Sequence, residues 1–105
     1  MAYLLADGKQ CNRTAAAKKL ANGGSVLVLP ELTDDVAELI EDLGLWGAYN
    51  YLFTYSTPTC FAGTATLDGF SAGDPEGWYW TVDGAGQYQT PDEALDVANG
   101  KLQEH

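Results

Sequence analysis

Between Leu43 and Leu67 the chain runs for 25 residues without a single charged side chain. A segment of this length could span a membrane, but its threonines and Asn50 are too polar for a lipid core. Buried strands explain the segment better. Tyr49–Ser56 alternates in the manner of a strand with two different faces, and Cys60–Leu67 is expected to return antiparallel after Thr57-Pro58-Thr59.

Two strands and a helix are predicted before this segment. Ala2–Leu5 is expected to be a short strand, and Ser25–Leu29 is an apolar run typical of a strand buried on both faces. Between them, Asn12 or Thr14 can cap a helix that stops at Asn22-Gly23-Gly24. Strand–helix–strand units favour a right-handed crossover, so we expect these two strands to be parallel.

A second helix is predicted from Thr33 to Leu43. Its apolar stripe has the spacing i, i+3, i+4 and i+7, and Gly44 is expected to end it. The stripe consists of Val36, Leu39, Ile40 and Leu43. The outward arc carries only acids, two of them in the first turn, where the helix dipole favours anions. These acids are Asp34, Asp35, Glu38, Glu41 and Asp42.

The last third of the chain predicts a hairpin followed by a third helix. Trp78–Asp83 alternates as a strand does, Asp83-Gly84-Ala85-Gly86 has hairpin-turn chemistry, and Gln87–Gln89 begins the return. Thr90-Pro91-Asp92-Glu93 is a capping box with proline at the first helical position. We expect Trp78 and Trp80 to lie in the core together with Phe53.

These elements predict a single α+β domain over residues 1–105, in the order β-α-β-α-β-β-β-(β)-α. We expect a small two-layer fold with a mixed, mainly antiparallel sheet of four to six strands. About three helices should largely cover one face of this sheet. Aromatic residues beyond what one core can use, such as Tyr55 and Tyr79, would form an exposed patch.

Lysine and arginine are absent from Leu20 to Gly100, whereas 13 of the 15 acids fall within that run, and the net charge is −10. The negative electrostatic field of such a chain repels phosphate and attracts cations. Direct nucleic-acid binding through the aromatic strands is therefore disfavoured, because that mode needs a positive groove. The N-terminus has no basic flank or long apolar run, so we expect a cytoplasmic protein with Cys11 and Cys60 unpaired.

The chain lacks the histidine-based and metal-ligand arrangements on which many enzymes depend. His105 is the only histidine, which leaves no base for a nucleophilic triad and too few ligands for zinc. Two carboxylates among Asp68, Asp74, Glu76 and Asp83 could act as in glycosidases, and the Asp68–Glu76 loop could hold calcium. Turn formation explains these acids better. We expect no enzymatic activity, no cofactor and no metal.

The hypothesis that remains is a non-enzymatic acidic protein that binds and blocks a basic, nucleic-acid-handling partner. Small phage-encoded inhibitors of restriction and CRISPR systems belong to this functional class. The residues expected to meet the partner are Asp34, Asp35, Glu38, Glu41, Asp42, Asp74 and Glu76. The alternative is a structural or accessory phage or mobile-element protein that acts through an aromatic or strand-edge interface, possibly as a homodimer.

Overall fold

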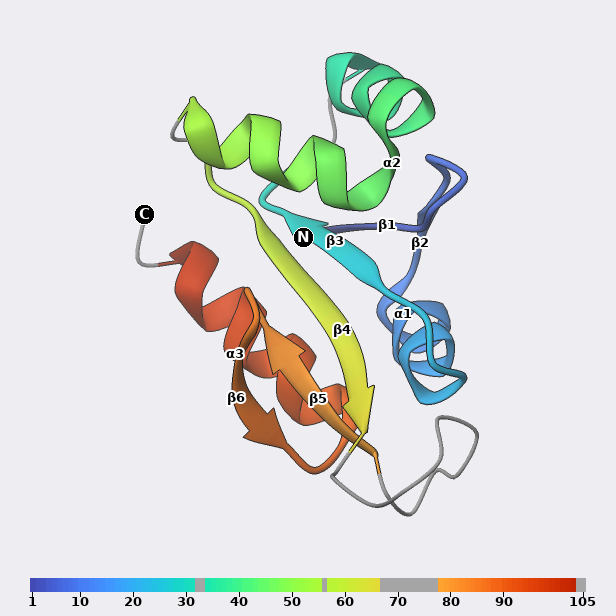
Figure 1. Ribbon diagram of the computed structural model, residues 1–105, viewed down its shortest axis with the longest axis vertical. Helices are drawn as coiled ribbons and strands as arrows, with labels where there is room; N and C mark the ends of the chain where they lie inside the picture. The colour runs from blue at the N-terminus through green and yellow to red at the C-terminus, as the bar shows by residue number, and fades with distance from the viewer. Residues whose placement is uncertain (32–33, 56, 67–77, 104–105) are drawn as a thin grey trace.

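In the computed structural model the described residues, 1–31, 34–55, 57–66 and 78–103, form six strands and three helices (Figure 1). In chain order the elements are β1 (Ala2–Leu4), β2 (Gln10–Cys11), α1 (Arg13–Ala21), β3 (Val26–Leu29), α2 (Asp34–Thr54), β4 (Cys60–Thr66), β5 (Trp78–Val82), β6 (Ala85–Tyr88) and α3 (Pro91–Gln103). The strands make one sheet in the order β2-β1-β3-β4-β5-β6. The α+β class, the three helices and a sheet of up to six strands are confirmed.

The parallel pairing predicted for the first two strands is wrong, because β1 and β3 are antiparallel, with Tyr3 opposite Val28. The sequence reading missed strand β2. A turn at Gly8, whose φ of 82° suits glycine, returns the chain so that Leu4 pairs with Gln10. Because β2 carries the chain back along β1, helix α1 begins at the end of the sheet where β1 begins. After the helix, β3 therefore runs antiparallel to β1. Asn12 caps α1 as expected, and its side chain accepts a hydrogen bond from the Ala15 N–H at 2.8 Å.

The strand predicted at Tyr49–Ser56 is also wrong, because α2 continues to Thr54. Gly44 does interrupt the helix, with φ 76° and ψ 174°, but a second helical half follows it. The buried side chains of that half have the spacing i, i+3, i+4 and i+7, which is helical. They are Leu45, Ala48, Tyr49 and Leu52. Alternating aromatic residues concealed this period, so β4 pairs with β3 and β5 instead of with residues 49–56.

Helices cover both faces of the sheet, which changes the expected two-layer arrangement. Helices α1 and α3 pack on one face, where Val26 and Val28 of β3 point. Helix α2 packs on the other face against Leu27 and Leu29 of β3, together with β1 and β4. Strand β3 is therefore buried on both faces, as its continuous apolar sequence predicts. The expectation of helices on one face holds for α1 and α3 only.

The C-terminal third follows the sequence prediction closely. Val82 pairs with Ala85, so Asp83 and Gly84 form the turn, with φ values of 56° and 77°. Positive φ at both central residues is the mark of a type I′ hairpin turn. The hydroxyl of Thr90 accepts a hydrogen bond from the Glu93 N–H at 3.1 Å, which begins α3 as the capping box predicts.

Candidate functional site

Helix α2 brings together most of the acids predicted to bind a partner. Asp34 is its first residue, and Asp35, Glu38, Glu41 and Asp42 are all exposed on its first half. No ion pair reaches these four exposed carboxylates within the part of the chain that the structure describes. The other two predicted residues, Asp74 and Glu76, lie outside the described residues.

The basic residues that form ion pairs do so with acids of other elements. Arg13 lies 2.6 Å from Asp96 and 3.8 Å from Asp92, and Lys101 lies 3.2 Å from Asp83. Helix α1 thus docks on α3 by charge as well as by packing. The charge of the α2 acids is therefore not balanced by the ion-paired cations of the described chain.

The kink at Gly44 sets the two halves of α2 at an angle to each other (Figure 1). A helix continued straight through this position would leave the first half without a facing wall. Instead, a groove of about 420 Å³ separates the halves, and we call it the α2 groove. It is lined by Asp35, Val36, Glu38, Leu39, Asp42, Tyr51, Leu52 and Thr57.

The structure divides the predicted acidic arc into two groups. Asp35, Glu38 and Asp42, at i, i+3 and i+7, share the stripe that lines the α2 groove. Glu41 is not part of the lining, and its side chain lies beside Gly8 in the β1–β2 turn. Helical spacing therefore separates Glu41 from the three acids of the groove, although the sequence analysis places all four in one outward arc.

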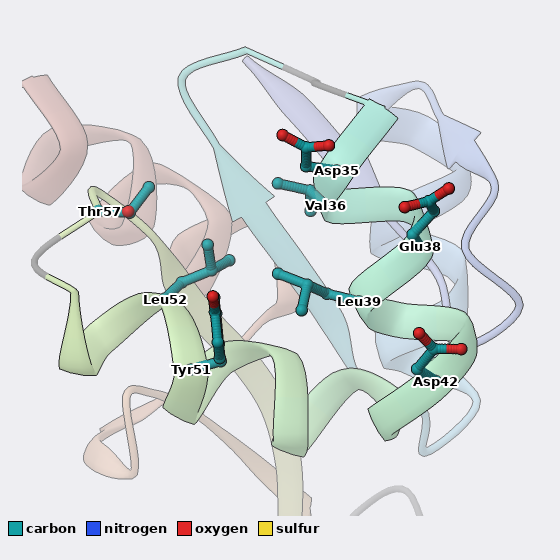
Figure 2. A pocket seen from close by; sticks show the side chains of 8 residues that line it. All are labelled: Asp35, Val36, Glu38, Leu39, Asp42, Tyr51, Leu52 and Thr57. Atoms are coloured by element: carbon teal, nitrogen blue, oxygen red, sulfur yellow. The ribbon is translucent and has the colours of Figure 1, made fainter.

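Apolar side chains complete the α2 groove. Figure 2 shows Leu39 and Leu52 pointing towards each other from the two halves of the helix. Leu52 and Val36 are buried, whereas Leu39 is half-buried. A smaller hollow of about 200 Å³ adjoins the groove, because both share Val36 and Thr57. Its other lining residues are Leu29, Pro30, Glu31 and Pro58.

Not every predicted core residue is buried. Trp80 is buried and donates a hydrogen bond from Nε1 to the Leu20 carbonyl at 3.0 Å. The predictions that Leu43 and Phe53 are core residues are wrong, since 52% and 69% of their surfaces are exposed. Leu43 directly precedes the kink, and Phe53 belongs to a helix instead of the expected strand, so each points away from the core.

Exposed aromatic rings flank the second half of α2 on two sides. On one side Trp46 and Phe53 are exposed, and the Trp46 ring lies 5.3 Å from Phe61 of β4. On the other side the rings of Tyr51 and Tyr55 are tilted by 46° to each other, with their centroids 4.7 Å apart. Tyr51 also lines the α2 groove, on the opposite half of the helix from the three acids of the lining.

The buried thiol and phenol are poorly suited to ionise. Cys60 is buried beside the Ala98 carbonyl, and burial, with a smaller contribution from Asp83, raises its pKa to about 12. Burial raises the pKa of Tyr49 to about 12 as well, again with a contribution from Asp83. Cys11 and Cys60 are both free thiols. The Cys60 thiolate needed for nucleophilic chemistry is therefore scarce at neutral pH.

The described residues show neither a metal-binding cluster nor a membrane-spanning helix. They contain no group of three or more histidine, cysteine, aspartate or glutamate side chains placed to hold a metal ion. Within the same parts of the chain, no helix combines the length and the apolar content needed to cross a membrane.

Sequence reasoning missed the apolar and aromatic side of the groove. The alternating pattern of the sequence predicts a strand and a turn at these positions, Tyr51, Leu52 and Thr57. The helical spacing of the buried residues Leu45, Ala48 and Leu52 is the signal that could have found them. The sequence predicts that a helix ends at Gly44, whereas the structure has a bend there within α2.

The chain matches no protein-family model, no curated protein and no solved structure at a significant level.

Proposed function

We propose that this protein is a non-enzymatic, cytoplasmic inhibitor that binds and blocks a basic, nucleic-acid-handling protein through the acidic first half of α2. The observation that carries the proposal is the set of exposed carboxylates on this helix with no ion-pairing partner in the described chain. Small phage-encoded inhibitors of restriction and CRISPR systems are the functional class in which we place it.

The spacing of the acids supports imitation of a nucleic-acid strand. Residues 34 to 42 carry five acids, and at a rise of about 1.5 Å per residue they span about 12 Å. One carboxylate every 3 Å or so is close to the phosphate density of a single DNA strand, about one charge per 3.4 Å. A surface that binds phosphates would therefore meet a similar charge density on α2.

Electrostatics would favour both the speed and the selectivity of such binding. A basic partner is drawn to the acidic helix at long range, and phosphate-bearing competitors are repelled. Exposed charge pairs are screened by salt over about 10 Å at 0.1 M ionic strength. Steep salt dependence is thus the property that separates this mode of binding from an apolar contact.

Affinity capture at graded salt tests the proposal. The immobilised protein is incubated with host lysate, washed between about 0.05 and 0.5 M salt, and the retained proteins are identified by mass spectrometry. We expect basic nucleic-acid-binding proteins at low salt and their loss at high salt. The double variant Glu38→Gln and Asp42→Asn should retain much less of them.

The matched control removes the same charge elsewhere. Asp92→Asn with Asp96→Asn lowers the negative charge by two on α3, which covers the other face of the sheet. Thermal melting of both variants establishes that they are folded. If the two double variants lose the partner equally, net charge and not the α2 surface governs binding. That result, or capture of no basic protein at any salt, would overturn the proposal.

One observation favours the alternative of an accessory protein with an aromatic interface. Trp46 and Phe53 are 59% and 69% exposed on one side of α2. Two such rings expose roughly 190–320 Å² if each presents 150–250 Å² in full. A stable interface needs about 800 Å² on each partner, so this patch alone is too small. Sedimentation at several salt concentrations tests it, since an apolar homodimer should persist at high salt.

A further inference from the structure

We propose that the α2 groove receives an arginine side chain of the basic partner, flanked by an apolar residue, an inference that rests on the proposed function. The groove measures about 420 Å³, within the roughly 300–1,000 Å³ of typical ligand pockets. Its lining combines an apolar floor, which matches the aliphatic stem of an arginine side chain, with one aromatic ring and three carboxylates, which match its guanidinium head.

The apolar floor suits the aliphatic stem of a long basic side chain. Leu39 and Leu52 face each other across the groove, and Val36 lines it one helical turn before Leu39 (Figure 2). Arginine and lysine bury their methylene groups along such surfaces while the charged head stays at the rim. A purely polar cation would leave the half-buried Leu39 facing water and would gain little from the groove.

The charged and aromatic groups select the head of that side chain. Asp35, Glu38 and Asp42 line the first half of α2, and Tyr51 lies on the second half. A guanidinium is planar, weakly hydrated and able to bind a carboxylate through two hydrogen bonds while it stacks on a ring. An ammonium group is compact and strongly hydrated, so the groove should prefer arginine to lysine.

The neighbouring hollow indicates what lies beside the arginine. Its walls are mostly apolar, with Leu29, Pro30 and Pro58 beside one acid, Glu31. It adjoins the α2 groove, since the two share Val36 and Thr57. An apolar side chain next to the arginine fits this hollow. A second copy of the protein is a poor occupant, because each copy carries a net charge of −10 and the groove wall is itself acidic.

Short peptides test the inference on the intact protein by NMR. The probes are acetyl-Leu-Arg-Leu-amide and two analogues in which lysine or citrulline replaces the arginine. We expect the arginine peptide to shift the backbone amide signals of Leu39, Tyr51 and Leu52. It should bind about two- to fivefold more tightly than the lysine peptide, as expected for an exposed cation–π contact. Uncharged citrulline should produce no saturable shift.

Two single variants separate the groove from general charge. Glu38→Gln should weaken the arginine peptide by about two- to fivefold, as loss of an exposed ion pair does. Glu41→Gln removes the same charge from the same helix but outside the lining, and it should weaken binding of the arginine peptide less than Glu38→Gln does. Tyr51→Leu keeps an apolar wall and should abolish the preference for arginine over lysine.

The outcomes distinguish this inference from the proposed function. Equal weakening by Glu38→Gln and Glu41→Gln, or equal binding of the arginine and lysine peptides, would overturn the arginine site. Saturation with the citrulline peptide would do the same. The salt-graded capture of basic proteins could still succeed in any of these cases, so the proposed function would stand. Failure of that capture would remove both.

Discussion

Gly44→Ala is the substitution that tests the bend in α2 most directly. Gly44 has φ 76° and ψ 174°, a conformation that is almost exclusive to glycine and costs other residues of order 1–3 kcal/mol. A Cβ added at this position would meet no atom within 4 Å. The expected loss of about 1–3 kcal/mol therefore comes from the backbone alone, without any steric clash.

Gly100→Ala is the matched control. Gly100 lies inside α3, and a Cβ there also meets nothing within 4 Å. Its φ is not positive. Alanine at an exposed helical position should instead stabilise the protein by about 0.5–1 kcal/mol. The two glycines have equally open surroundings, yet the two substitutions should change the stability of the protein in opposite directions.

Urea denaturation followed by circular dichroism measures both variants. The midpoint should fall for Gly44→Ala and rise for Gly100→Ala, with an unchanged m-value, because neither substitution alters the surface exposed on unfolding. A Gly44→Ala protein as stable as the wild type would refute the reasoning. The helix would then pass through residue 44 without the bend, and its two halves would not enclose the α2 groove.

Two further predictions concern the second half of α2 and the core beneath it. Leu52→Ala should lower stability by about 2–5 kcal/mol because this side chain is buried. Phe53→Ala, at an exposed position, should change stability by about 0.5 kcal/mol or less. If urea denaturation gave the reverse order, a strand at these residues would be favoured over a helix. Stability should also fall as the pH rises from about 9 to 12, because Cys60 and Tyr49, with pKa values raised to about 12, keep their protons in the folded protein after the unfolded chain has lost them. Each group contributes a slope of up to about 1.4 kcal/mol per pH unit, so Cys60→Ala should make the fall shallower, and an unchanged slope would contradict the assignment.

Local signals in the sequence predicted those elements that depend on neighbouring residues. The Asn12 cap, the turn at Asp83 and Gly84, and the capping box at Thr90 all form as predicted. The continuous apolar sequence of strand β3 likewise predicts burial on both faces, because an exposed face would leave valine or leucine in water. Helix α2 also begins with the acids that its first turn favours.

Tertiary packing decided what local patterns left open. The aromatic residues from Tyr49 to Tyr55 satisfy a strand period, while Leu45, Ala48 and Leu52 satisfy a helical one. Only the sheet beneath them selects between the two, because β1, β3 and β4 offer an apolar face that the helical stripe covers. The same packing turned Gly44 from a helix end into a bend.

The sequence by itself determined that the chain is acidic, that its cations are segregated from its acids, and that it has the elements of an α+β domain. Charge and capping are properties of residues and their near neighbours, so they can be read directly. The direction of β1 against β3, the cover on both faces and the α2 groove depend on contacts between distant segments. Those contacts compete for burial, and only the folded structure shows which of them prevail.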